Sequence, residues 1–328
     1  MGLIIGMDEA GYGPNLGPLV ITATVWEVPG HPRDIDFWSA FKDVVTSAPS
    51  RKDTRLHVAD SKAVYSPARG LKFLERSVLA GLRLCDETPA GFHELCARLT
   101  RSDATTPETF AARREPRPPG PETAEPWYVG RDLSLPRSKH SVDASAAGWL
   151  AACRRERITL RTIRSEIVEP TRFNSMVRDT GSKGVVLSRI SLGLLRRVWD
   201  PDVDEPTLII ADKHGGRNRY DDLLSEITDD RKILTLEEST PLSCYRVGQS
   251  EIRFRTKAEA HLPVALASMV CKYVRELAMD LFNEFWAERV SDLKPTKGYP
   301  VDARRFKIDI AKAQQQLGII DDILWRER

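Results

Sequence analysis

The sequence predicts an α/β fold with a mixed sheet, because apolar strand segments alternate with helical segments along the chain. Residues 3–7 form a short apolar run that ends at Asp8, and residues 207–212 form a continuous apolar run that ends at Asp212. Continuous apolar runs of this length are typical of strands buried on both faces of a sheet. Residues 263–286 show the longest helical pattern, which begins with Pro263 at a suitable first position. Such a helix is suited to cover one face of the sheet.

The remaining elements follow from turn residues and from apolar spacing. A Gly- and Pro-rich turn over residues 10–18 joins the first strand to a β-branched strand. Alternating or helically spaced apolar positions then predict strands over 19–25, 157–168 and 233–236 and helices over 67–84 and 184–199. The strand at 233–236 is a candidate neighbour of the strand at 207–212.

One part of the chain differs in composition from the rest. Residues 101–140 are centred on a run over 113–121 with too many prolines for a helix or a central strand. We interpret residues 86–155 as an inserted, partly Pro-rich segment. Residues 1–85 and 156–328 are assigned to one catalytic domain, although a length of 328 residues also permits two domains.

Composition excludes several classes of protein. Apolar residues make up 41% of the chain and charged residues 29%, a balance that predicts a folded core. The net charge is only +2, so a polyanionic partner has to be held by a local basic patch. Five scattered cysteines without a C-x-x-C pair argue against a zinc ribbon and a secreted disulfide framework. With no signal peptide and no apolar run of about 18 residues, we expect a cytoplasmic protein without a membrane span.

Four acidic residues are candidates for one metal site. If the strands that precede Asp8 and Asp212 are parallel neighbours, both carboxylates emerge at the same edge of the sheet. Glu9 adjoins Asp8, and Glu276 lies on the long helix, on one face with Lys272. Converging carboxylates persist at neutral pH with cations between them or with raised pKa values, and all-oxygen ligands suit Mg²⁺ or Mn²⁺. This pattern favours a two-metal site for phosphodiester hydrolysis.

Each of these acids also has an ordinary structural explanation. Asp8 and Glu9 could form a turn or a cap, Asp212 could simply end a strand, and Glu276 could be an ion-paired residue on a helix surface. The glycines of residues 11–17 could serve a tight turn alone. No G-K-[ST] follows them, which disfavours a phosphate-binding P-loop.

The order of five segments along the chain, and the residues in each, favour a catalytic role for these acids. The segments are GMDEAGYGP over 6–14 with Gly17-Pro18, DSK over 60–62, the strand that ends at Asp212, Lys257 ahead of ASMVCKYVRE over 267–276, and KGYP over 297–300. In this order they resemble the type 2 ribonuclease H family, the ribonucleases HII and HIII. The matches span residues 3 to about 300, and residues 86–155 have no counterpart.

The resemblance implies a ribonuclease H-like fold with a mixed five-stranded sheet flanked by helices. It implies hydrolysis of the RNA strand of RNA/DNA hybrids with two Mg²⁺ or Mn²⁺ ions as cofactors. The catalytic, metal-binding residues implied by the matching motifs are Asp8, Glu9, Asp212 and Glu276. Gly11, Tyr12, Gly13 and Tyr299 look like contacts to the substrate sugar, and Lys62 lies in a matching motif.

The branch within the family stays open. Ribonuclease HII has Arg between the two glycines and Asp at the place of Glu276, so Tyr12 and Glu276 look closer to ribonuclease HIII. That second branch usually carries an extra substrate-binding domain before the first strand. The loss of the Arg leaves cleavage at a single embedded ribonucleotide open as well.

Basic residues near the acids are candidates for phosphate contacts. Lys213, His214, Arg217 and Arg219 directly follow Asp212. Lys257 could line the site or lie on the surface, and the whole run could be a solvated loop. Discrimination of RNA from DNA requires a contact to the 2′-OH, which a glycine turn permits by close backbone approach.

We therefore predict a monomeric endoribonuclease that acts on RNA/DNA hybrids. One alternative keeps the fold but takes another nucleic acid as substrate. Another is a non-catalytic hybrid-binding module, which the complete acidic set disfavours because unneutralised carboxylates weaken phosphate binding.

Overall fold

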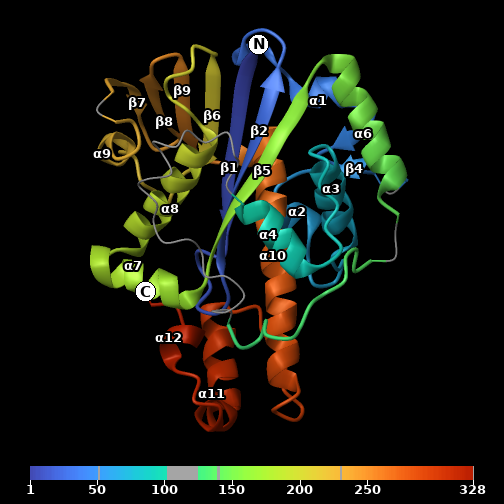
Figure 1. Ribbon diagram of the computed structural model, residues 1–328, viewed down its shortest axis with the longest axis vertical. Helices are drawn as coiled ribbons and strands as arrows, with labels where there is room; N and C mark the ends of the chain where they lie inside the picture. The colour runs from blue at the N-terminus through green and yellow to red at the C-terminus, as the bar shows by residue number, and fades with distance from the viewer. Residues whose placement is uncertain (51, 102–124, 139–140, 230, 328) are drawn as a thin grey trace.

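A seven-stranded mixed sheet forms the centre of the computed structural model, which describes residues 1–50, 52–101, 125–138, 141–229 and 231–327. The strand order is β5-β2-β1-β6-β9-β8-β7 (Figure 1). The strands are β1 (Gly2–Ala10), β2 (Leu19–Val28), β5 (Thr159–Val168), β6 (Thr207–Asp212), β7 (Ile233–Glu238), β8 (Leu242–Val247) and β9 (Ser250–Arg255). The predicted α/β class is confirmed.

The register of the central strands places the first predicted acids together. β1 is antiparallel to β2 and parallel to β6, with Leu3 opposite Thr207 and Met7 opposite Ala211. The next positions along the two strands are Asp8 and Asp212. Because parallel strands end at the same edge of a sheet, the two carboxylates leave the sheet side by side, as the sequence predicted.

The sheet has seven strands where five were expected. β9 runs parallel to β6, and the antiparallel strands β8 and β7 extend the sheet beyond it. The expected pairing of 233–236 with 207–212 is wrong, since β6 pairs with β1 and β9. β7 is the outermost strand and most of its side chains are exposed, so its apolar residues do not mark a core position.

Helices cover both faces of the sheet (Figure 1). α10 (Leu262–Ala287) packs along β1 and β2 on one face, together with α3 (Lys72–Arg83). α7 (Pro170–Thr180) and α8 (Lys183–Val198) pack on the other. Along β1, Ile4 belongs to the core on the α10 side, whereas Ile5 and Met7 belong to the core on the α8 side. This alternation explains why the whole run is apolar.

Parts of the expected insertion belong to the main core. α4 (Phe92–Thr100) and α6 (Asp143–Glu156) share the core on the α10 side. The ring centroid of Trp127 lies 4.9 Å from that of Phe282 on α10, and the ring centroid of Trp149 lies 6.2 Å from that of Trp26 on β2. The proline-rich run over 113–121 lies outside the described residues.

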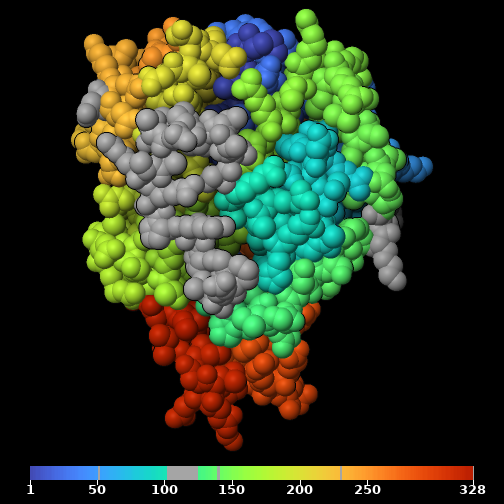
Figure 2. Space-filling model, viewed as in Figure 1, coloured from blue at the N-terminus to red at the C-terminus, as the bar shows by residue number. Residues whose placement is uncertain are grey.

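Short elements and the C-terminal helices complete the fold. The short elements are η1 (Pro32–Asp34), α1 (Phe37–Ala40), β3 (Val45–Thr46), β4 (Leu56–His57), α2 (Ser61–Val64), α9 (Asp221–Ser225) and η3 (Ala258–Ala260). α11 (Pro300–Gln316) and α12 (Asp321–Leu324) lie together at the lower end of the molecule beside the end of α10 (Figure 2). Trp325 then forms a β-bridge with Leu16, which brings the C-terminal segment back to the loop after β1. None of the described helices combines the length and the apolar character needed to cross a bilayer.

A glycine permits the close approach of β1 to α10. A Cβ at Gly6 would lie 2.3 Å from the carbonyl carbon of Pro263 and 2.5 Å from the nitrogen of Val264. These are backbone atoms, so a side chain at this position would force the strand and the helix apart. The residue therefore sets the distance between α10 and the strand that carries Asp8.

We predict that Gly6→Ala lowers the free energy of unfolding by about 1–3 kcal/mol, the usual cost of overpacking a core. Gly193→Ala is the matched control, because Gly193 lies within α8 and a Cβ there would have no atom within 4 Å. Urea unfolding monitored by far-UV circular dichroism measures both. Equal stability of the Gly6→Ala variant and the wild type would contradict the described packing.

Candidate active site

Asp8, Glu9 and Asp212 lie near the edge where β1 and β6 end, where Asp8 feels the charge of Glu9 and Glu9 feels the charge of Asp212. Asp8 is buried, accepts a hydrogen bond of 2.8 Å from the backbone nitrogen of Glu9, and lies near Ser268 of α10, whose hydroxyl partly opposes the rise in the Asp8 pKa. The charge of Asp212 acts on Glu9, and Oδ1 of Asp212 is buried without a hydrogen-bond partner among the described residues. The structure thus brings three of the four predicted acids together.

Burial and mutual repulsion dominate the electrostatics of these acids. Burial is the largest cause that raises the pKa of Asp8 well above its usual value, and the charges of Glu9 and Glu259 add to it. Burial, followed by the charges of Asp212 and Glu259, raises the pKa of Glu9 to about 7. Burial also raises the pKa of Asp212. Each shift reports a cost of holding negative charge here without a compensating cation.

Glu259 is a further candidate for the site, which the sequence analysis did not name. It lies on η3, immediately after β9, and its pKa is raised by burial and then by the charges of Asp212 and Asp60. It also acts on both Asp8 and Glu9. The strand β9 could have revealed Glu259. Because β9 runs parallel to β6, an acid that follows β9 is expected at the same sheet edge as Asp212. We call Asp8, Glu9, Asp212 and Glu259 the acid group.

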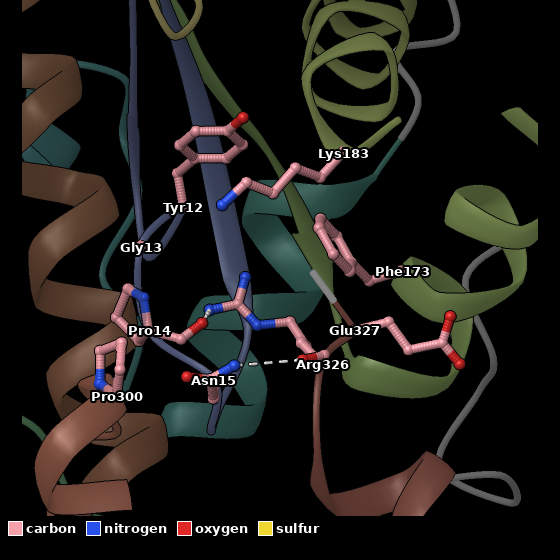
Figure 3. Close-up of a pocket in the computed structure, with 9 residues that line it drawn as sticks. All are labelled: Tyr12, Gly13, Pro14, Asn15, Phe173, Lys183, Pro300, Arg326 and Glu327. Carbon is pink, nitrogen blue, oxygen red and sulfur yellow. Dashed lines mark hydrogen bonds between the residues drawn. The ribbon is translucent and has the colours of Figure 1, made fainter. Parts of the chain in front are cut away.

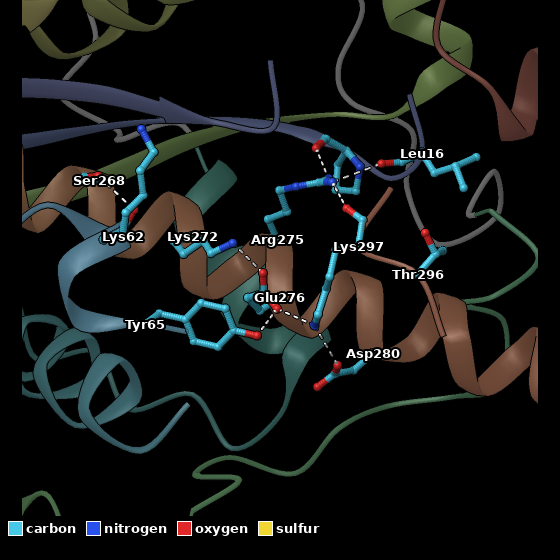
Figure 4. Close-up of polar contacts among 12 residues, drawn as sticks. Leu16, Lys62, Tyr65, Ser268, Lys272, Arg275, Glu276, Asp280, Thr296 and Lys297 are labelled. Atoms are coloured by element: carbon cyan, nitrogen blue, oxygen red, sulfur yellow. Dashed lines mark hydrogen bonds and ion pairs between the residues drawn. The ribbon is translucent and has the colours of Figure 1, made fainter. Parts of the chain in front are cut away.

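Glu276 lies outside the acid group and has other partners in this structure, so its role as a metal ligand stays a prediction. Its carboxylate is held by Tyr65, Lys272 and Lys297, each at 2.6 Å (Figure 4). After the burial penalty, these two lysines are the largest influences on Glu276, and they hold its pKa below the usual value. Ser268, which contacts Asp8, lies eight residues earlier on α10, which is about 12 Å along a helix axis.

Lys62 is the cation that faces the acid group, in accordance with its place in a matching motif. Its charge lowers the pKa values of Glu9, Asp212 and Glu259. The short helix α2 holds it there, because the side chain of Asp60 caps the helix by accepting from the backbone nitrogen of Lys62 at 3.0 Å. Lys62 therefore offsets part of the repulsion among the acids.

The loop over residues 11–18 borders the acid group, and two glycines shape it. Gly11 has a φ of 96°, and a Cβ there would lie 2.5 Å from the carbonyl oxygen of Pro18. A Cβ at Gly13 would meet nothing within 4 Å, so the backbone at this position is open to an approaching molecule. The charge of Glu9 raises the pKa of the Tyr12 hydroxyl after the larger effect of burial, which places this side chain near the acids.

Arg275 ties this loop to the segment that carries Tyr299. The guanidinium donates to the backbone oxygens of Pro18 at 2.9 Å, Leu16 at 3.1 Å and Lys297 at 3.0 Å (Figure 4). The backbone of Asn15 also donates to the oxygen of Gly298 at 2.7 Å. Tyr299, which follows, is 54% exposed. The two segments that the sequence analysis linked to sugar recognition are thus neighbours.

The basic residues after Asp212 take different places. Lys213 is buried, and its Nζ donates to Asn218 Oδ1, the Ser239 backbone oxygen and Ser243 Oγ. Its ammonium joins the loop to β8 in this structure, and substrate binding by Lys213 stays a prediction. His214 is buried too, and burial lowers its pKa to about 3, which leaves the ring neutral and unsuited to shuttle protons.

Arg217 and Lys257 remain available near the site. The charge of Arg217 lowers the pKa of Tyr12, which places the guanidinium on the side of the glycine loop. Lys257 is exposed, has a left-handed backbone with a φ of 57°, and precedes Glu259 by two residues.

The acid group has the chemistry of a divalent-cation site. Within the described ranges, no three His, Cys, Asp or Glu side chains already stand at metal-binding separation. The residues nevertheless fit a hard cation: all four offer carboxylate oxygens, their pKa values are raised, and Asp212 Oδ1 lacks a partner among the described atoms.

Comparisons with known proteins give similar solved structures only. No family model matches the sequence, and no curated protein matches it. The similar structures include ribonuclease H2 from Pyrococcus horikoshii, which is 16% identical with a TM-score of 0.45 over 98% of this chain and 92% of that chain. Ribonuclease H3 from Aquifex aeolicus is 13% identical, with a TM-score of 0.42 over 98% of this chain and 71% of that chain. Ribonuclease HII of Archaeoglobus fulgidus, solved with PCNA, is 14% identical, with a TM-score of 0.39 over 99% of this chain and 94% of that chain.

We predict opposite effects on stability for two glutamates in metal-free buffer. Glu276→Gln destabilises the protein at pH 7.5 by roughly 1–3 kcal/mol, because it removes the partner of two lysines. Glu259→Gln stabilises it, because it removes a charge that repels Asp212.

The pH dependence follows from the directions of the two shifts. The pKa of Glu276 is lower in the folded protein than in the unfolded chain. Its ionised carboxylate therefore stabilises the fold above the unfolded pKa of about 4.3, and this stabilisation is lost as the pH falls through the folded pKa. The pKa of Glu259 is raised, so its charge destabilises the fold. This destabilisation is absent in acid and grows as the pH rises. Urea unfolding at pH 4 and 7.5 measures both. A stabilising Glu276→Gln at pH 7.5 would contradict the pairing.

Proposed function

We propose that this chain is a metal-dependent endoribonuclease that hydrolyses the RNA strand of RNA/DNA hybrids. The observation that carries the proposal is the position of the acid group beside an open glycine loop, with Lys62 facing the acids. A nuclease of this kind needs a place for the scissile phosphate and a means to sense the 2′-OH next to it. The motif resemblance supports the same activity.

The acid group would hold two Mg²⁺ or Mn²⁺ ions through Asp8, Glu9, Asp212 and Glu259. When bound, such ions activate water and stabilise the leaving oxygen in phosphodiester hydrolysis. The side chains contribute negative charge at a buried position, where the pKa of Glu9 near 7 ties ion binding to deprotonation. Ser268 favours the charged form of Asp8, and Lys62 limits repulsion among the acids.

The glycine loop would select for RNA. The open backbone at Gly13 lets amide and carbonyl groups approach a ribose closely, and a 2′-OH can both donate and accept a hydrogen bond there. Gly11 provides the turn, and Tyr12 within the loop and Tyr299 beside it carry rings suited to contact a sugar or a base. Arg217 and Lys257 are the basic candidates for contacts to phosphates beside the acids.

Cleavage assays test this proposal. Labelled RNA/DNA hybrid, DNA duplex with one embedded ribonucleotide, double-stranded RNA and double-stranded DNA are incubated with the protein and Mg²⁺ or Mn²⁺. We expect cleavage of the hybrid, loss of activity with EDTA, and a rate at least about a hundredfold lower for Asp212→Asn, since ions at such sites stabilise the transition state by several kcal/mol.

Two further variants distinguish the role of the acid group from that of Glu276. Glu259→Gln is expected to lower the rate to a similar extent, and the Mn²⁺-induced rise in melting temperature is lost with it. Glu276→Gln keeps the Mn²⁺ shift, because its carboxylate is committed to lysines. A fully active Asp212→Asn variant, or hybrid binding without any metal-dependent turnover, would refute the nuclease assignment.

A further inference from the structure

A small cavity of about 180 Å³ lies beside the glycine loop, next to Tyr12 (Figure 3). The loop supplies one wall, and the start of α8, the Phe173 ring of α7 and the C-terminal segment supply the others. Its lining includes Tyr12, Gly13, Phe173, Lys183, Arg326 and Glu327.

Arg326 is the most unusual residue of this cavity. Its side chain is 1% exposed, and its Nη2 donates to the backbone oxygens of Gly11 and Pro14. Its Nε and Nη1 are buried without a hydrogen-bond partner among the described residues. Burial, followed by the charge of Arg275, lowers the pKa of Arg326 to about 9, and Glu169 offsets this only in part. A buried cation with free donors is costly unless an anion approaches it.

The opposite wall is positive as well. Lys183 is the first residue of the 16-residue helix α8, and its Nζ lies 4.9 Å from the centre of the Tyr12 ring. In Figure 3 the Lys183 amine and the Arg326 guanidinium reach toward the segment 12–14 from different sides. A helix start adds a partial positive charge and free amide groups to this wall. The acid of the lining, Glu327, pairs with Arg178 at 2.8 Å.

We infer that this cavity binds a phosphate group of the nucleic-acid strand, held between Lys183 and Arg326 on the side of Tyr12 away from the acid group. The inference rests on the proposed function for the identity of the strand. Tyr12 lies between the two places, since it borders this cavity and also feels the charge of Glu9. In this inference the phosphate is a neighbour of the scissile one, and its capture would fix the register of the strand on the acid group.

The first experiment uses inorganic phosphate alone, with EDTA present to remove divalent ions. We expect phosphate to raise the melting temperature of the wild type by roughly 2 °C near tenfold saturation, relative to sodium chloride of equal ionic strength. Lys183→Met loses the rise and Lys183→Arg keeps it. Lys232→Met, which removes an exposed charge just before β7, also keeps it. No rise in the wild type, or an equal rise in Lys183→Met, would overturn the inference.

The second experiment measures hybrid binding in the Asp212→Asn background, where cleavage does not interfere. Lys183→Met and Arg326→Met are expected to weaken binding about tenfold. Each is also expected to reduce the slope of log K against log salt by about one, whereas Lys232→Met leaves the slope unchanged. Circular dichroism verifies that Arg326→Met is folded. Lys183→Met tests the cavity without removing the hydrogen bonds by which Arg326 holds the glycine loop.

The outcomes separate this inference from the proposed function. If phosphate stabilises the wild type but neither variant weakens hybrid binding, the cavity takes free phosphate and the inference is wrong. If the variants weaken hybrid binding while the wild type fails to cleave hybrid, the phosphate site stands and the nuclease assignment falls.

Discussion

The repulsion among buried and half-buried carboxylates at one edge of the sheet is the constraint on which the site depends. Asp8 and Asp212 meet there because β1 and β6 are parallel neighbours, and Glu259 arrives because β9 continues the parallel order. Burial and like charge raise the pKa values of all of them, so the arrangement is costly in the absence of cations. Lys62 and Ser268 offset part of that cost, and divalent ions would offset more.

Two buried arginines position the glycine loop that completes the site. Arg275 of α10 holds the loop from the core through the oxygens of Leu16 and Pro18. Arg326 holds it from the C-terminal segment through the oxygens of Gly11 and Pro14. The loop is therefore fixed through its backbone, while Gly13 stays open toward solvent. None of these arginine contacts involves the backbone of Gly13.

The central strands and the long helix could be predicted because continuous apolar runs and helical spacing leave few alternatives. β9 was missed because its sequence, SEIRFR, contains charged residues that pair with other charges at the sheet, such as Glu251 with Arg253. Without β9, Glu259 had no expected position in the sequence analysis. The partners of Glu276 and Lys213 come from segments distant in sequence, so spacing alone could not reveal them.

The most direct test of the acid group is anomalous diffraction from a crystal of the protein soaked in Mn²⁺. The account predicts manganese peaks bounded by the carboxylates of Asp8, Glu9, Asp212 and Glu259, at about 2.0–2.2 Å from the coordinating oxygens. It also predicts that Glu276 keeps its lysine partners in that crystal. Manganese bound at Glu276 and Asp280, with the acid group free of metal, would contradict it.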